Sequence, residues 1–233
     1  MHRTTAYRML AVLAEEGVLE RNEETNKYVI GPALFSLGSL YLNTNTLFSM
    51  AEPVVKAMND LTGEVTNLAI MNSEGNITFI MREESKHPLR VGLHVGFSSP
   101  AYAHALGKAM LAELDEAELD RLYPDEGLPL LTKKTVPTKT LLKQELEEIR
   151  KTGVAYNDQQ AFEGVEAVAA VIRDRAGKVV AATGIGVPSV RMDTLRRKLL
   201  SSLIKLGADL ISYRLGYHDE KIAVRTVEEL RSW

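Results

Sequence analysis

Two pairs of strand-forming segments, each joined by a short turn, limit most strongly what this chain can fold into. Residues 165–173 and 179–187 are rich in valine, isoleucine and alanine, and the turn between them contains Gly177. Residues 64–71 and 77–84 form a second such pair, with an Asn- and Gly-containing turn between them. Strands joined by turns this short pair in the antiparallel sense. The sequence therefore predicts an antiparallel sheet that contains two hairpins.

Helical periodicity before, between and after these hairpins predicts that helices flank the sheet. The predicted helices are residues 48–61, 102–113, 116–123 and 138–152, and a further strand is predicted at residues 89–94. A long final helix is predicted from an apolar stripe that consists of Leu195, Leu199, Leu203, Leu206, Leu210, Tyr213 and Tyr217. Antiparallel hairpins with helices at both ends of a domain are typical of the α+β class. We therefore expect an α+β domain at residues 46–217 and a polar tail at residues 218–233.

The first 45 residues follow a different pattern. The predicted elements are a helix at residues 3–16, strands at residues 18–21 and 27–30, and a connecting helix at residues 33–45. The apolar face of the first helix consists of Ala6, Leu10, Leu13 and Ala14. A helix followed by a hairpin is the second half of a winged helix-turn-helix. We therefore assign residues 1–30 to a partial winged helix-turn-helix domain and residues 31–45 to a linker helix.

The absence of cysteine excludes several kinds of protein. The net charge of −3 shows that the chain as a whole is not strongly basic. Without cysteine the chain has no disulfide, no thiolate nucleophile and no cysteine-ligated zinc. No apolar run reaches the roughly 18 residues that span a bilayer, and the first residues lack the pattern of a secretory signal. Local positive charge lies at the start, where His2, Arg3 and Arg8 precede the first acid, Glu15. We expect a cytoplasmic protein whose phosphate contacts lie in these first turns.

Three segments, in order along the chain, resemble the IclR family of bacterial regulators. RTTAYRMLAVLAEEGVLERNEETNKYVIGPALFSLG resembles that family's recognition helix, wing and linker. PAYAHALGKAMLAEL is similar to the family's loop-helix in the effector domain, and GVAYNDQQAFEGVEAVAAVIRDRAGKVVAATGIGVPSVR to its C-terminal strand-loop-strand region. The resemblance covers residues 3–218 and implies a GAF- or PAS-like effector domain. Because it begins inside the recognition helix, it also implies that the family's first DNA-binding helices are missing.

Under this resemblance the first helix is the recognition helix of a DNA-binding domain. Hydroxyl, phenol and guanidinium groups contact phosphates and base edges, and the residues that would do so are Arg3, Thr4, Thr5, Tyr7 and Arg8. From the residue types alone, a solvated polar helix face is the alternative interpretation. The adjoining hairpin and the resemblance favour DNA binding.

The resemblance also implies an effector-binding pocket in the second domain. The residues to which it points are His104, Ala105, Gly107, Asn157, Asp158, Ala167, Gly184 and Gly186. The family favours acids at the positions of Asn157 and Gln160, and serines at the positions of Gly184 and Gly186. Without those hydroxyls we expect a larger and less polar pocket, which suits an organic acid with an aromatic or extended apolar body. A strand bulge or a close backbone approach is the alternative role of the two glycines.

His104 and Gly107 have structural alternatives of their own. His104 lies in the apolar segment AYAHALGKAML and is either a wall of the pocket or a packed, hydrogen-bonded histidine. Gly107 allows either close helix packing or the approach of backbone to a ligand. Gly107 and Lys108 are not part of a phosphate loop, because Tyr102 stands where that loop needs glycine.

An enzyme is the rival interpretation from another class. A hydrolase or isomerase would use Asp158, Glu163 or His104 as acid or base. The chain has neither a GxSxG elbow nor cysteine, and the pair Gly184 and Gly186 lacks the third glycine of a dinucleotide fingerprint. A metal held by His94, His104 and Asp158 is a minor hypothesis. We therefore expect no enzyme, no metal and no cofactor.

Together these features indicate a DNA-binding transcription regulator whose affinity for a double-stranded operator is modulated by a small organic acid. We expect at least a homodimer, and a tetramer as a further form, because two recognition helices are needed to read a two-fold operator. The candidate interface residues in the linker are Leu34, Phe35, Leu37, Leu40 and Tyr41. A small-molecule sensor that has lost DNA binding is the alternative.

Overall fold

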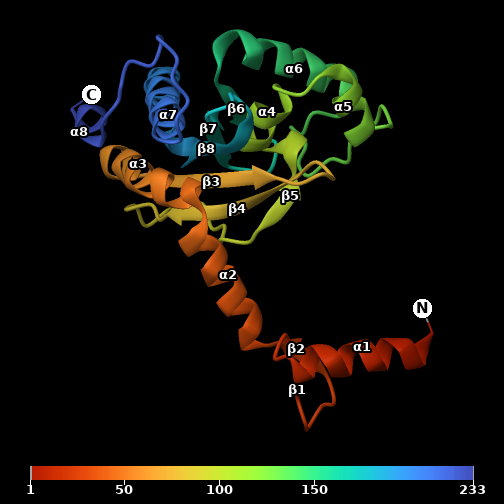
Figure 1. Cartoon of the computed structure of the whole chain (residues 1–233). Helices are drawn as coiled ribbons and strands as arrows, with labels where there is room; N and C mark the ends of the chain where they lie inside the picture. Colours follow the sequence, from red (N-terminus) through yellow and green to blue (C-terminus); the bar gives the residue numbers. More distant parts are fainter. Residues whose placement is uncertain (1, 233) are drawn as a thin grey trace. The chain divides into compact units, whose positions relative to one another are not determined.

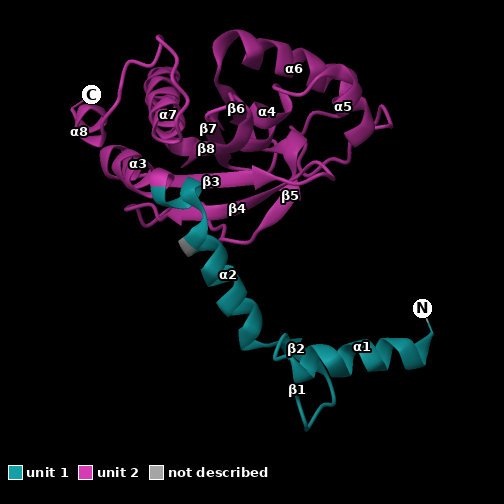
Figure 2. Ribbon diagram, in the orientation of Figure 1, with its two compact units in different colours: residues 1–49 teal, residues 50–233 magenta. Residues whose placement is uncertain are grey.

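The computed structural model describes residues 2–232, except for the side chain of Asn43. The chain divides into two compact units, residues 1–49 and residues 50–233 (Figure 2). No helix within the described residues is long and apolar enough to cross a membrane.

The first unit consists of a helix, a two-stranded hairpin and a second helix. Its elements are α1 (Arg3–Glu15), β1 (Leu19–Arg21), β2 (Tyr28–Ile30) and α2 (Pro32–Thr44). The two strands are antiparallel, with Glu20 opposite Val29. Gly17 follows α1 with a φ of 68°, a left-handed conformation that glycine adopts without strain. The predicted partial winged helix is therefore confirmed.

The described side chains of this unit form almost no core. No side chain of α1 is buried, and its predicted apolar face includes the exposed Leu13 beside the half-buried Leu10 and Ala14. Burial of apolar surface is the main force that stabilises a folded chain. The first unit therefore presents apolar surface that another surface can cover.

A six-stranded antiparallel sheet of order β5-β4-β3-β8-β7-β6 forms the centre of the second unit. The strands are β3 (Val65–Met71), β4 (Asn76–Glu83), β5 (Ser98–Pro100), β6 (Ala155–Asp158), β7 (Val165–Arg173) and β8 (Val179–Pro188). The two predicted hairpins are β3–β4 and β7–β8. They join through β3 and β8, where Asn67 lies opposite Gly184. The predicted antiparallel sheet is confirmed, and its central pair joins segments that are distant in the sequence.

Helices pack on both faces of this sheet. The helical elements are α3 (Thr46–Thr62), η1 (Ala101–Ala103), α4 (Ala105–Leu111), α5 (Glu116–Leu122), α6 (Lys139–Thr152), η2 (Ser189–Arg191), α7 (Thr194–Arg214) and α8 (Val227–Arg231). Figure 1 labels the α-helices among them. α4 shares one hydrophobic core with Phe79, Ala169 and Ala182. Because side chains alternate along a strand, the buried Val168 and Ala170 point to the other face, where α7 contacts β7 and β8. The predicted α+β architecture is confirmed.

Both edges of the sheet differ from the prediction. Residues 89–94 form no strand; they lie in a loop in which Val91 is buried and its carbonyl accepts a hydrogen bond from Arg82. The edge strand is instead β5, where Ser99 lies opposite Ile77 of β4. The strand β6 at the other edge was not predicted, because its four residues are too few to show an alternating pattern.

Three helical segments also differ from the prediction. The predicted helix at residues 102–113 is interrupted at His104, whose extended backbone (φ −116°, ψ 144°) separates η1 from α4. Leu195 and Leu199, predicted to be in the apolar stripe of α7, are 78% and 55% exposed. The segment predicted as a polar tail contains α8 and buries Leu230. The break at His104 is the difference that bears on function.

Two helical glycines allow close packing in the second unit. A Cβ added at Gly107 would lie 2.1 Å from the carbonyl oxygen of Ala101 in η1. A Cβ added at Gly207 in α7 would lie 2.2 Å from Sδ of Met58 in α3. A methionine side chain can move aside, whereas the backbone of η1 cannot do so without disturbing α4. Gly107 is therefore the stricter of the two requirements.

We expect Gly107→Ala to lower the free energy of unfolding by about 2–3 kcal/mol, because overpacking against backbone leaves no alternative rotamer. For a chain of this size that corresponds to a fall in melting temperature of about 5–10 °C, measured by circular dichroism. Gly127→Ala is the matched control, since an added Cβ there would meet nothing within 4 Å. Equal melting temperatures for the two variants would contradict the packing role of Gly107.

Candidate functional site

A small cavity lies beside the start of α4, between the sheet and two loops. Its volume is about 30 Å³, which is enough for one water molecule. The residues that line it are Asn67, Phe79, Val91, Leu93, His104, Ala105, Leu106, Asn157, Ala161, Phe162, Val165, Ala167, Ile185 and Gly186. They come from β3, β4, β6, β7, β8, α4, residues 89–97 and residues 159–164. The lining includes no lysine, arginine, aspartate or glutamate, so the site is apolar with a few amide and imidazole groups.

His104 is the polar group with unused hydrogen-bonding capacity in this cavity. Its ring is buried and meets the rings of Phe79 and Phe162 edge-on, with centroids 5.9 Å apart in each case. Among the described residues, His104 Nε2 is buried without a hydrogen-bond partner. Burial, helped by the nearby charge of Lys108, lowers the pKa of His104 to about 4. The imidazole is therefore neutral at physiological pH and can accept or donate one hydrogen bond at Nε2.

Asn157 has its hydrogen bonds satisfied within the protein. Its Nδ2 donates to the carbonyl of Ala103, and its Oδ1 accepts a hydrogen bond of 3.0 Å from the backbone N–H of Gln160. Gln159, which directly precedes Gln160, has a φ of 58°, which marks a tight turn at the end of β6. Asn157 therefore joins this turn to η1 and shapes the wall of the cavity.

A buried lysine stands behind this wall. Lys108 is 2% exposed, and its Nζ donates to Oε2 of Glu145 and to the carbonyl of Tyr156, both at 2.7 Å, and to Oε1 of Gln160. Burial lowers the pKa of Lys108, and the charge of Glu145 opposes that shift. Because Gln160 also bonds to Asn157, one network ties α4, α6 and β6 together.

Comparison with known proteins identifies the relatives of this chain. Residues 39–213 match the family model described as bacterial transcriptional regulator IclR C-terminal. The chain belongs to the IclR family. The HTH-type transcriptional repressor AllR of Salmonella typhimurium is 30% identical over 213 residues, which cover 91% of this chain and 78% of AllR. The HTH-type transcriptional regulator BhcR of Paracoccus denitrificans is 29% identical over 216 residues, 93% of this chain and 77% of BhcR.

Solved structures of IclR-family proteins share this fold. The IclR crystal structure from Thermotoga maritima aligns with a TM-score of 0.76 and 28% identity, and the alignment covers 93% of this chain and 87% of that one. The Agobacterium tumefaciens repressor BlcR aligns with a TM-score of 0.70 and 25% identity, over 94% of this chain and 86% of that one. The resemblance inferred from the sequence is therefore confirmed, and the chain is an IclR-family transcriptional regulator.

The structure brings together five of the eight residues that the family resemblance points to. The cavity lining contains His104, Ala105, Asn157, Ala167 and Gly186. Their assignment as effector contacts stays a prediction. Sequence reasoning missed the aromatic walls Phe79 and Phe162, because nothing in the order of residues shows that β4 and the turn after β6 meet at α4.

The other three predicted residues lie outside the cavity lining. Gly107 faces Ala101, so the close-packing alternative describes it. Asp158 pairs with Lys134 through both carboxylate oxygens at 2.9 Å. A Cβ added at Gly184 would lie 2.9 Å from the side chain of Leu106. The two glycines thus lie in close packing contacts and Asp158 in a surface ion pair, and their assignment as effector contacts stays an untested prediction.

The expectation of a larger pocket is wrong for this structure. The space that a side chain at Gly184 would take is occupied by Leu106, and Val65 and Val91 lie next to the equivalent space at Gly186. Gly186, the one of the two glycines in the lining, nevertheless leaves the lining less polar than a serine there would. Close approach of neighbouring groups, rather than a bulge between β7 and β8 at these residues, accounts for the glycines.

The predicted DNA contacts share one exposed helix. α1 carries Arg3, Thr4, Thr5, Tyr7 and Arg8, all of them exposed. The guanidinium of Arg3 lies 5.9 Å from the centre of the Tyr7 ring. Their assignment as DNA contacts also stays a prediction.

The residues of the enzyme hypothesis do not form a catalytic arrangement among the described residues. Asp158 pairs with Lys134, whose hydrogen bond lowers the pKa of the carboxyl, and Glu163 is exposed. No hydrogen bond joins either carboxylate to His104 in the part of the chain that the structure describes. Within the same residues, no three histidine, aspartate or glutamate side chains gather into a metal-binding group.

Burial of His104 predicts a specific dependence of stability on pH. The unfolded imidazole takes up a proton near pH 6.5, the folded one only near pH 4, so the unfolded state binds more protons between these values. The free energy of unfolding therefore falls as the pH drops through this window, by about 2–3 kcal/mol at pH 4.5. We expect His104→Gln to lose that part of the dependence in urea denaturation at pH 7.5 and 4.5.

His218→Gln, which changes an exposed histidine, is the control and should keep the wild-type dependence. If His104→Gln lost as much stability between the two pH values as the wild type does, His104 would not be the buried neutral group described here.

Proposed function

We propose that this chain binds operator DNA through α1 and the β1–β2 wing, and that a small organic acid bound beside His104 modulates that binding. The observation that carries the proposal is the buried Nε2 of His104, which has no partner among the described residues and lines a cavity in the C-terminal unit. Buried polar groups in proteins are almost always paired. An unpaired group at a cavity therefore offers a hydrogen bond to the polar atom that occupies the cavity, and we propose that an atom of the effector takes this position in place of a water molecule.

The lining of the cavity indicates the chemistry of this effector. An oxygen of a carboxyl group can pair with His104 Nε2, while Phe79, Leu93 and Phe162 provide contacts for an aromatic or extended apolar body. Since none of the described residues that line the cavity is cationic, the acid is held by hydrogen bonds and burial rather than by an ion pair. A ligand larger than one water molecule enters only if the side chains that fill the space, above all Leu106, move.

Effector binding changes DNA affinity insofar as the effector prefers one geometry of the protein. Two copies of α1 are needed for a two-fold operator, so we propose that the active form is at least a homodimer, with a tetramer as a further form. The exposed apolar residues of α2 that we assign to the interface are Leu34, Phe35, Leu37, Leu40 and Tyr41. This role places the protein with DNA in the cytoplasm and requires no catalysis.

A thermal-shift screen of carboxylic acids tests the effector site. An acid at 100 times its dissociation constant should add about 2.7 kcal/mol to the free energy of unfolding, which raises the melting temperature by about 5–10 °C. His104→Phe keeps an aromatic ring but removes Nε2, so we expect it to abolish the shift. The same substitution at the exposed His218 should leave the shift intact. A shift that survives His104→Phe would place the effector elsewhere.

The salt dependence of DNA binding tests the role of α1. The DNA is a duplex selected from a random library. Arg3→Ala and Arg8→Ala should each lower the magnitude of the slope of log affinity against log salt by about 1, because binding with one phosphate contact fewer releases about one counterion fewer from the DNA. Lys56→Ala, at an exposed position on α3, should leave the slope unchanged. Failure to select any duplex would favour the alternative of a sensor that does not bind DNA.

A further inference from the structure

A second concavity, separate from the cavity beside His104, lies between α6, β6 and α7. Its volume is about 880 Å³, within the range of pockets that hold metabolites. It shares no lining residue with the cavity beside His104. We call it the α6–α7 groove, and Lys108, Tyr156 and Gln160 are among the residues that line it.

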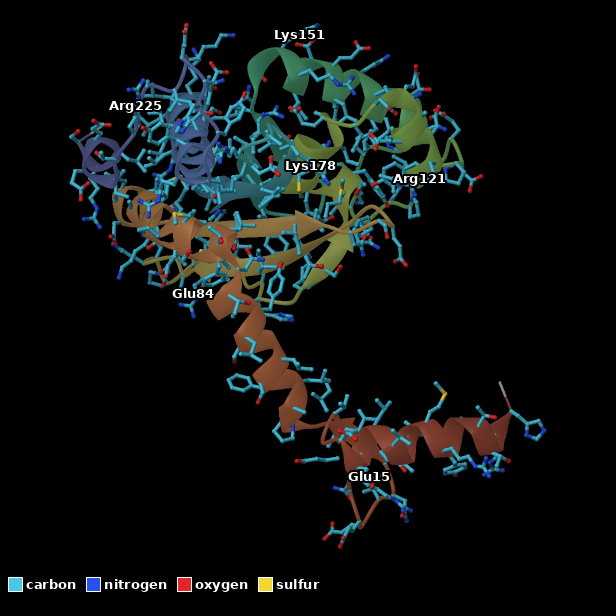
Figure 3. All side chains as sticks on the ribbon, in the orientation of Figure 1. Glu15, Glu84, Arg121, Lys151, Lys178 and Arg225 are labelled. Carbon is cyan, nitrogen blue, oxygen red and sulfur yellow. The ribbon has the colours of Figure 1, made fainter. Side chains whose placement is uncertain are left out.

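The carboxylates of the groove are already neutralised by neighbouring cations. Glu145 pairs with the buried Lys108 at 2.7 Å. Asp158 pairs with Lys134 at 2.9 Å. Glu148 pairs at 2.6 Å with Lys151, which Figure 3 labels on the outer side of α6. None of these acids is left to attract a cation into the groove.

The cations that α7 contributes to the groove are not neutralised in this way. Arg197, Lys198 and Lys205 line the groove and are exposed. Within the described residues, none of the three forms an ion pair within 4.0 Å. The charges of Asp158 and Asp209 act on Arg197 and Lys205 from a greater distance. The groove therefore carries three cations without a direct ion-pair partner among the described residues, in a concavity where such charges raise the local concentration of anions.

Two of these cations are held at separate points of the groove. The guanidinium of Arg197 lies 4.3 Å from the centre of the Tyr156 ring, a stacking arrangement that restrains its orientation. A Cβ added at Gly153, where α6 ends, would lie 3.0 Å from Nζ of Lys205, so that ammonium lies against the end of α6. The Cα atoms of Arg197 and Lys205 are eight helical residues and therefore about 12 Å apart. Ser201 lies between them on the same face of the helix.

We propose that the α6–α7 groove is a second ligand site, which binds an organic anion of metabolite size with two separated acidic groups. One acidic group pairs with Arg197 and Lys198, and the other with Lys205. The hydroxyl of Ser201, which also lines the groove, donates a hydrogen bond to either a phosphate or a carboxylate oxygen. The proposal does not depend on the effector site beside His104.

Isothermal titration calorimetry on the whole chain, in 150 mM salt, tests the proposal with three probes. Fructose 1,6-bisphosphate presents two separated phosphates, hexanedioate presents two separated carboxylates, and inorganic phosphate presents a single anion. We expect at least one of the separated di-anions to bind at least tenfold more tightly than inorganic phosphate. Whichever di-anion binds more tightly identifies the acidic group for which the groove is built.

Substitutions then locate the binding. Arg197→Gln and Lys205→Gln should each weaken the preferred di-anion at least tenfold, while Lys221→Gln, at an exposed lysine outside the groove, should not. Both groove residues are exposed, so melting temperatures should stay at the control value. Absence of di-anion binding at millimolar concentration, or binding that both variants retain, would overturn the proposal. So would variants that lose binding to a DNA duplex but keep the di-anion, because the cations would then be a DNA contact.

Discussion

A buried ammonium group connects the elements on which both cavities depend. Lys108 comes from the middle of α4, and its acceptors lie in α6, in β6 and in the turn after β6. Placing a charge away from water is unfavourable unless its hydrogen bonds are completed. The three acceptors complete them from three segments at once. α4 is therefore held in one position on the sheet, and His104 at its start is held with it.

The same network lies between the two concavities. On one side Gln160 bonds to Asn157 in the wall beside His104. On the other side Lys108, Glu145 and Gln160 line the α6–α7 groove. A ligand that altered the turn after β6 would thus disturb groups that line both concavities. The arrangement explains why a lysine stands in a helix that is otherwise apolar.

Much of the architecture could be predicted from the sequence, because it depends on local patterns. The hairpins β3–β4 and β7–β8 follow from short turns between strand-forming runs, and the helix predicted at residues 138–152 is found as α6, which ends at Thr152. Residues 89–94 and β6 were predicted wrongly or missed, since edge segments are short and their order depends on neighbouring segments. The same holds for Leu195, which has the spacing of a buried stripe but lies on the exposed side of α7.

The sequence by itself determined the fold class, the family and the region of the candidate site, because hairpin turns, helical periodicity and family segments are encoded over short distances. Only the tertiary structure decided the size of the cavity, since Leu106 of α4 fills the space beside Gly184 of β8. It also decided that Asn157 is engaged within the protein, whereas His104 Nε2 has no hydrogen-bond partner in the part of the chain that the structure describes. These are outcomes of packing between segments distant in the chain, where each side chain's free space and hydrogen-bond partners depend on all the elements around it.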